Sequence, residues 1–187
     1  FDGNYFSGTI PTFGSSRLRE LYLGQNALTG SIPDSIGNLV SLEIFSASAN
    51  KLNSTIPAAI ATVDTLNILD LSHNKLTGEI PSEISGLMLL HELRLDHNRL
   101  QGLFPAWIGN LKHLRIVHLN NNLLDGELKL PINVGDLDDL TEFAIQNNDL
   151  SGVVSEDLCD LLLDVLTSDC WGSKPRVDCH VVLNAFK

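Results

Sequence analysis

The chain has 187 residues, 43% of them hydrophobic, so it holds enough apolar material for a sizeable core. Its formal net charge of −11 repels phosphate backbones, and we therefore expect no nucleic-acid partner. The sequence contains no apolar run of the roughly 18 residues that a membrane-spanning helix needs, so no span is expected in this chain.

An asparagine returns at an almost constant interval along the chain. The recurring residues are Asn4, Asn26, Asn50, Asn74, Asn98, Asn122 and Asn148. The first step between them is 22 residues, the last is 26, and the others are 24. A period in this range is typical of a solenoid, in which each repeat forms one coil.

Each coil is predicted to contain the same elements in the same order. Leu69 and Leu71 alternate with polar neighbours, which predicts a short strand with one buried face. Asn74 follows where the chain leaves the strand, and its amide can bond to backbone groups of neighbouring coils. Gly78, four residues later, suits a turn with positive φ. Pro81 then suits the start of a short helical turn with an apolar inner side.

The repeated phrase N-x-L-x-G-x-I-P-x-x-I-x-x-L-x-x-L-x-x-L-x-L resembles the plant-type leucine-rich repeat over residues 1–158. The resemblance implies an α/β solenoid, a right-handed superhelix with a concave parallel β-sheet and short helical or 3-10 turns on the convex side. It also implies a second short strand after the asparagine. Members of this family are mostly extracellular, as receptor ectodomains, inhibitors of wall-degrading enzymes, or secreted adhesion and matrix proteins.

Residues 159–187 depart from the repeat and are expected to form the C-terminal cap of the same solenoid. They hold all three cysteines, Cys159, Cys170 and Cys179, which favours a stapled end and an oxidising compartment. Cys179 can pair with Cys170 or with Cys159, and an odd cysteine remains in either case. The segment resembles the cap of secreted diatom-type leucine-rich repeat proteins. The other end lacks a matching cap, so we expect further repeats or a cap before Phe1.

Candidate binding residues are sought on the exposed strand positions, because the fold alone hosts many functions. Aligning the repeats places one concave residue between the two buried leucines of each strand, with one further column on either side. Isoleucines beside charged residues predict a contact patch, although isoleucine also simply favours strands, and Asp70 beside Arg94 can be a plain cross-strand pair. The candidates are Tyr22, Ile44, Ile68, Asp70, Arg94, Asp96, Ile116 and His118.

We expect no catalysis, cofactor or metal. The chain lacks a Gly-rich nucleophile elbow, a phosphate loop and an H-E-x-x-H motif. His73 and His97 share one column on adjacent coils, but no third ligand with metal-site spacing is evident, which favours solvated imidazoles. Ice binding would need a regular row of threonines, which the columns lack. Asn53 begins the single N-x-T acceptor, on an expected exposed turn, and is a candidate glycosylation site.

Two functions remain open from the sequence. The first is an extracellular recognition module that binds a protein or a glycan through its concave face, which the varied concave columns favour. The alternative is a structural subunit of an extracellular wall, matrix or filament, which associates with copies of itself. The odd cysteine and the missing N-terminal cap favour this alternative.

Overall fold

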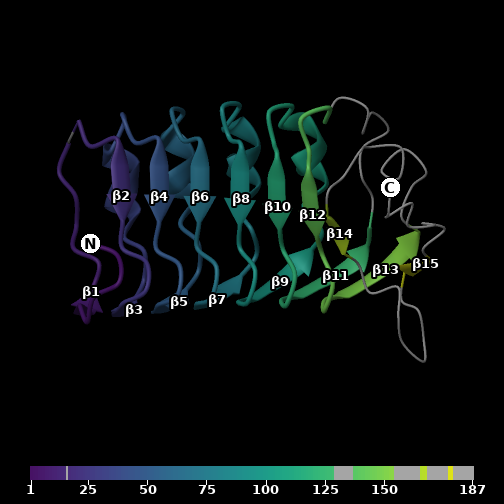
Figure 1. The fold of residues 1–187 in the computed structure, drawn as a ribbon, viewed down its shortest axis with the longest axis horizontal. Helices are drawn as coiled ribbons and strands as arrows, with labels where there is room; N and C mark the ends of the chain where they lie inside the picture. The colour runs from purple at the N-terminus through teal and green to yellow at the C-terminus, as the bar shows by residue number, and fades with distance from the viewer. Residues whose placement is uncertain (16, 129–136, 154–164, 168–176, 179–187) are drawn as a thin grey trace.

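Successive repeats wind into a solenoid in which equivalent elements of neighbouring coils lie side by side (Figure 1). The computed structural model describes residues 1–15, 17–128, 137–153, 165–167 and 177–178. The predicted boundary at residue 158 and the candidate disulfide residues Cys159, Cys170 and Cys179 lie outside the described residues. The division into repeats and cap therefore stays a prediction, as does the disulfide.

The leucine-rich strands form a seven-stranded sheet in which every pairing is parallel. Its strands are β2 (Glu20–Tyr22), β4 (Ile44–Ser46), β6 (Ile68–Asp70), β8 (Glu92–Arg94), β10 (Ile116–His118), β12 (Glu142–Ala144) and β14 (Val165–Thr167). The central residues of adjacent strands pair in register, as Leu69 does with Leu93. Residues that are equivalent in the aligned repeats are thus neighbours in the sheet, because each coil contributes one strand. This register confirms the alignment of the repeats.

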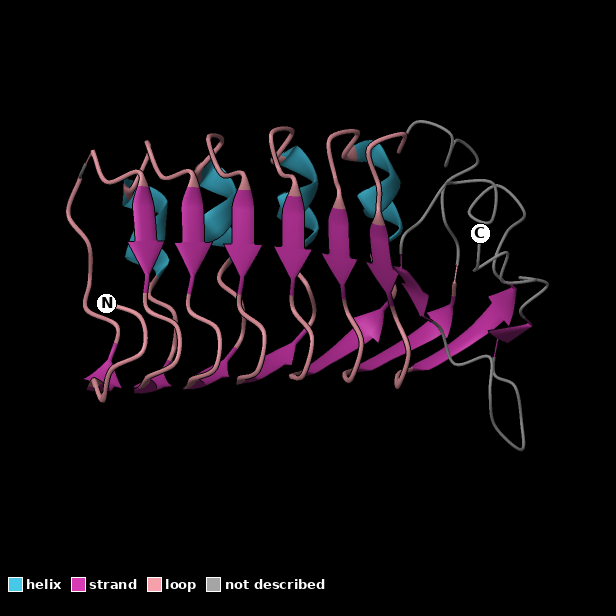
Figure 2. Ribbon diagram, viewed as in Figure 1, coloured by secondary structure: helices cyan, strands magenta, loops and turns pink. Residues whose placement is uncertain are grey.

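A second parallel sheet runs along one edge of the first, and short helices lie behind the first sheet (Figure 2). The second sheet contains β1 (Ser7–Thr9), β3 (Ala27–Gly30), β5 (Lys51–Ser54), β7 (Lys75–Gly78), β9 (Arg99–Leu103), β11 (Leu123–Glu127), β13 (Asp149–Val153) and β15 (Val177–Asp178). The 3-10 helices are η1 (Asp34–Asn38), η2 (Ala58–Thr62), η3 (Ser82–Gly86) and η4 (Ala106–Asn110). Each helix follows directly after a proline, as the sequence predicts.

The apolar core lies between the first sheet and the helices. The central strand residues Phe45, Leu69 and Leu93 are fully buried, and so are Ile36 and Ile84 of the helices. Each of these side chains packs against equivalents in the neighbouring coils, because a single coil has no apolar partner of its own. The predicted solenoid is thus confirmed, and the first sheet presents its opposite face as the surface on which a site can be built.

The asparagine ladder ties neighbouring coils together through their backbones. Asn74 Oδ1 accepts a hydrogen bond from the Leu52 amide at 2.9 Å, and Asn74 Nδ2 donates to the Ala47 carbonyl at 2.9 Å. Asn50, Asn98, Asn122 and Asn148 repeat both contacts one coil apart. The predicted role is therefore confirmed at these five asparagines, which satisfy backbone groups that the turns would otherwise leave unpaired, whereas Asn4 donates within its own coil.

Two positions of each repeat need a left-handed backbone. The predicted glycine position has φ between 76° and 87° at Gly30, Gly78, Gly102 and Gly126. In the coil that contains Asn50, Ser54 occupies this position with φ 77°, so a residue with a Cβ is held where glycine is favoured. The position before the ladder asparagine is also left-handed, including His73 and His97, both with φ 53°. The repeat pattern does not indicate this second position, because residues of different types occupy it.

Replacing Ser54 by glycine is expected to stabilise the fold by about 0.5–1 kcal/mol, because the strain of a left-handed serine exceeds the extra entropy of unfolded glycine. The matched control is Gly78→Ser, which builds the same residue into the next coil. A Cβ at Gly78 would lie 2.7 Å from Thr55 Cγ2, so this variant should lose stability. Urea unfolding of both variants measures the effect, and a destabilised Ser54→Gly variant would contradict the account of strain.

The described part of the chain holds no helix that is long and apolar enough to cross a membrane.

Candidate functional site

The strands of the first sheet present two columns of side chains that the backbone pairing places in register. The central column is Tyr22, Ser46, Asp70, Arg94, His118 and Ala144. The column before it is Glu20, Ile44, Ile68, Glu92, Ile116 and Glu142. Both columns are those expected from the repeat alignment, and parallel pairing keeps equivalent side chains about 4.8 Å apart.

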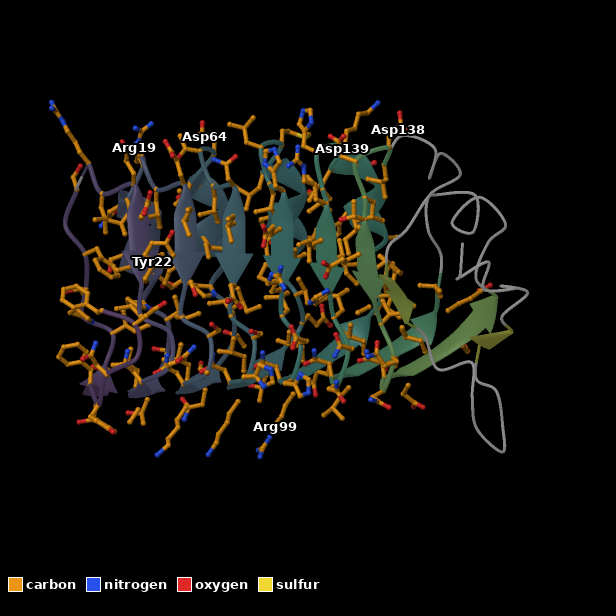
Figure 3. All side chains as sticks on the ribbon, viewed as in Figure 1. Arg19, Tyr22, Asp64, Arg99, Asp138 and Asp139 are labelled. Carbon is orange, nitrogen blue, oxygen red and sulfur yellow. The ribbon has the colours of Figure 1, made fainter. Side chains whose placement is uncertain are left out.

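The apolar part of this face is smaller than the sequence suggests. Ile44 and Ile68 are adjacent, but Glu92 separates them from Ile116, and all three isoleucines are half-buried rather than exposed. Tyr22 is 38% exposed and lies on the face of β2 (Figure 3). Partial burial of its ring raises the pKa of the Tyr22 phenol, and so does the Glu20 carboxylate, to which the hydroxyl donates a hydrogen bond.

Asp70 is bound within the sheet by neighbouring hydroxyls. Its Oδ1 accepts from the Ser72 hydroxyl at 2.7 Å and from the Ser72 amide at 3.1 Å, and its Oδ2 accepts from the Ser46 hydroxyl at 3.3 Å. Asp70 is paired in register with Arg94, but it does not form an ion pair with it. The cross-strand neighbours that the sequence suggested are therefore present in register, but their side chains do not pair. The guanidinium of Arg94 contacts other residues instead.

Arg94 belongs to a network of four side chains that crosses β8, β10 and β12. Its Nε donates to Glu92 Oε2 at 3.0 Å, and its Nη1 lies 3.5 Å from His118 Nδ1. His118 Nε2 in turn lies 2.8 Å from Glu142 Oε2. The exposed fractions of the four side chains are between 20% and 32%, so they are held in place yet can be reached by a partner.

The partners of His118 determine its tautomer. A guanidinium can only donate, so His118 Nδ1 accepts the contact from Arg94. An ionised carboxylate can only accept, so Nε2 carries the proton that is shared with Glu142. The imidazole thus connects a cation to an anion. Arg94 and His118 were among the predicted binding residues. Glu92 and Glu142 were not, although the aligned columns place them beside Arg94 and His118.

The three predicted columns form an acidic surface. The third column follows the second buried leucine of each strand and contains Asp96. Within the described residues, the columns hold five carboxylates, and Arg94 supplies the single guanidinium. The carboxylates belong to Glu20, Asp70, Glu92, Asp96 and Glu142. This surface should attract cationic groups by long-range electrostatics.

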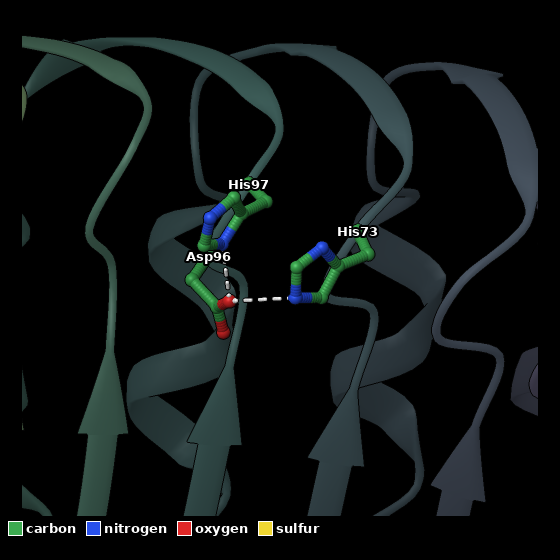
Figure 4. Close-up of side chains that lie close together, drawn as sticks. All are labelled: His73, Asp96 and His97. Carbon is green, nitrogen blue, oxygen red and sulfur yellow. Dashed lines mark hydrogen bonds and ion pairs between the residues drawn. The ribbon is translucent and has the colours of Figure 1, made fainter.

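Asp96 differs from the other candidate residues because it is buried, with only 8% of the residue exposed. Its Oδ2 lies 2.8 Å from His97 Nδ1 and 3.6 Å from His73 Nε2 (Figure 4). The expectation that no third ligating group accompanies the two histidines is therefore wrong: the residue before His97 supplies one. The available signal was this adjacency of Asp96 and His97 in the sequence.

Asn53 is exposed on β5, as expected for a glycosylation acceptor. It lies in the second sheet and not on the concave columns. A glycan at this position would therefore leave the Arg94 network accessible, because the two sheets present different surfaces of the solenoid (Figure 2).

A coil of fixed period with one exposed strand face defines a solenoid. Family models of the leucine-rich repeat match residues 48–100, 88–129 and 17–39. The chain is 31% identical to the ectodomain of the receptor kinase SOBIR1 from Arabidopsis thaliana, with a TM-score of 0.60, and the match covers 66% of this chain and 68% of that one. The chain therefore belongs to the leucine-rich repeat family, in its plant-type form.

Two further relatives show what such repeats do elsewhere. The Arabidopsis receptor kinase HAESA, solved in complex with the peptide hormone IDA and the co-receptor SERK1, is 31% identical, with a TM-score of 0.81 over 89% of this chain. Receptor-like protein 36 of Arabidopsis thaliana is 56% identical over 43 residues, or 21% of this chain. The chain spans only 28% of the HAESA chain and 6% of Receptor-like protein 36.

Proposed function

We propose that this chain is a non-catalytic, extracellular recognition domain that binds an extended segment of a protein partner on its concave face. The observation that carries the proposal is the Glu92–Arg94–His118–Glu142 network, whose charged side chains are fixed by one another and still partly exposed. Pre-organised charged groups lose little conformational entropy when a partner binds, which makes them suitable anchors. The likeness to ectodomains such as that of HAESA supports a peptide as the partner.

The charge of the concave columns defines the chemistry of the partner. Against the one guanidinium of Arg94, the described columns expose at least in part the carboxylates of Glu20, Asp70, Glu92 and Glu142, whereas that of Asp96 is buried, so a segment with basic side chains gains favourable electrostatic energy and faster association. Ile44 and Ile68 offer an adjacent apolar contact on β4 and β6, and the exposed Tyr22 ring lies on the neighbouring strand β2. We therefore expect a basic segment that also carries an apolar residue.

The extracellular setting is part of the same proposal. HAESA, SOBIR1 and Receptor-like protein 36 are plant receptors or receptor-like proteins, and the exposed Asn53 acceptor suits a secreted chain. Glycosylation of Asn53 would appear as a loss of mass when N-linked glycans are removed enzymatically from the secreted protein. An unchanged mass would remove this support.

Replacing Arg94 and His118 together by alanine is expected to weaken binding of peptides selected on this chain from a random library at least about tenfold, or 1.4 kcal/mol. The two truncations remove the side chains that hold the carboxylates of Glu92 and Glu142 in place, so these carboxylates lose the pre-organisation with which they receive a basic segment. Fluorescence anisotropy measures the affinities, and added salt should weaken the parent complex.

The matched control is Arg99→Ala with His113→Ala, which removes the same residue types from exposed positions outside the concave columns. Figure 3 shows Arg99 at the edge of the second sheet. Equal affinities for the concave variant and the control would contradict the site. Light scattering of the purified chain tests the alternative, since concentration-dependent polymers in place of a monomer would favour a structural subunit.

A further inference from the structure

A second group of polar side chains lies at the carboxyl ends of β6 and β8 and does not belong to the Arg94 network. It consists of His73, Asp96 and His97, and we refer to it as the histidine–aspartate cluster. His73 Nε2 lies 3.6 Å from Asp96 Oδ2, and His97 Nδ1 lies 2.8 Å from the same oxygen. The two imidazole rings are stacked with centroids 4.1 Å apart and planes 15° apart.

The backbone explains why the two histidines meet. Both have φ 53°, so their Cα–Cβ bonds leave the chain in the same direction on successive coils. The His73 amide donates to the Asp96 carbonyl at 2.9 Å, which fixes the two coils to each other at this point. The proximity of the three side chains is therefore set by the ladder of the solenoid and not by a chance arrangement of surface rotamers.

The donor set and its spacing suit a transition metal. Imidazole nitrogen and carboxylate oxygen bind Zn²⁺ at about 2.0–2.2 Å, and two ligands of a tetrahedral ion are then roughly 3.4 Å apart. The observed separations of 2.8 Å and 3.6 Å lie on either side of that value, and the donor atoms of the three residues all fall within 4.8 Å of one another. Ca²⁺ and Mg²⁺ favour oxygen ligands only. A site with two imidazole nitrogens and one carboxylate is therefore not expected to prefer either ion.

Burial is divided between the ligands in a way that suits an open site. The Asp96 side chain is 12% exposed, whereas those of His73 and His97 are 56% and 46% exposed. The carboxylate is thus anchored, and the imidazoles have the freedom to turn about their Cβ–Cγ bonds until both lone pairs converge. Three protein ligands leave one tetrahedral position for water.

We propose that His73, Asp96 and His97 bind one Zn²⁺ ion, with water as the fourth ligand. When His97 Nδ1 binds the metal, the neutral imidazole carries its single proton on Nε2, so no further proton has to leave the ring. This ion would add two positive charges beside the acidic concave columns. Among the described residues, this is the single group of three His, Cys, Asp or Glu side chains with such spacing.

Isothermal titration with ZnCl₂ tests the proposal on the full chain and on His73→Gln, His97→Gln and Asp96→Asn. We expect one equivalent of Zn²⁺ that each substitution weakens at least about tenfold or removes. Asp96 is buried, so circular dichroism must show that its variant is folded. His73→Gln alters an exposed side chain and keeps the proposal testable if the aspartate variant does not fold.

The matched control is His91→Gln with His113→Gln. These rings are also stacked on neighbouring coils, with centroids 6.0 Å apart, but they are not part of the cluster. Substituting Co²⁺ for Zn²⁺ separates binding by imidazole from binding by the chain's cysteines, because thiolate ligands add a charge-transfer band in the near ultraviolet. The proposal is overturned if Zn²⁺ does not bind, if the three substitutions leave binding unchanged, or if the control loses it equally.

Discussion

Replacing Asn74 by alanine is expected to lower the free energy of unfolding by about 3 kcal/mol. The substitution removes the acceptor of the Leu52 amide and the donor to the carbonyls of Ala47 and Leu71. The buried Leu52 amide is left unsatisfied, which costs about 1–3 kcal/mol, and the carbonyls of Ala47 and Leu71 each lose one donor while keeping another from Asn50 and Asn98. Urea unfolding followed by circular dichroism measures the loss.

Two comparisons separate the ladder from the general effect of removing an asparagine. Asn110→Ala alters an exposed residue at the end of η4 and should change stability by less than about 0.5 kcal/mol. Asn74→Asp keeps an acceptor for Leu52 but places a second oxygen against the Ala47 carbonyl, so it should destabilise at least as much as alanine. A small effect of both Asn74 variants would refute the role of the ladder.

Replacing Phe45 by alanine is expected to cost about 4 kcal/mol, the second large effect. Phe45 is fully buried at the centre of β4, and truncating such a ring loses its transfer energy and leaves a cavity. Its register partners on either side are Leu21 and Leu69. Neighbouring coils fix their spacing by strand pairing, which limits how far the cavity can collapse.

Phe45→Leu is the matched variant, because it installs the residue that the adjacent strands carry at this position. We expect it to cost less than about 1.5 kcal/mol, since it keeps most of the buried volume. Urea midpoints of the two variants give the difference directly. If leucine and alanine were equally destabilising, the loss would not arise from the size of the cavity, and the packing account would fail.

The period of the sequence is sufficient to predict the coils, the strand register and the columns of the concave face. Leu69, Asn74 and Gly78 recur at fixed offsets, and each offset has one physical cause: a buried face, a backbone partner or a left-handed turn. The same period also places Ser54 where other coils have glycine, so its strain could have been predicted. The stacking of coils leaves little freedom in these features.

The contacts between side chains could not be predicted in the same way. The columns place Arg94 beside Asp70, Glu92 and His118, and the sequence does not show which neighbour its guanidinium selects. That choice depends on rotamers and on competing partners, such as the hydroxyl of Ser72 that already binds Asp70. For the same reason Asp96 was assigned to the concave surface, although its carboxylate turns to His73 and His97 instead.

Amide hydrogen exchange measured by NMR tests the central claim most directly, namely that buried asparagines join successive coils into one solenoid. The amides that donate to ladder asparagines belong to Leu28, Leu52, Leu76, Leu100 and Leu124. We predict that all five exchange slowly in the native chain, and that Asn74→Ala selectively accelerates Leu52. Exchange of these amides at the rate of an unfolded chain would contradict the account.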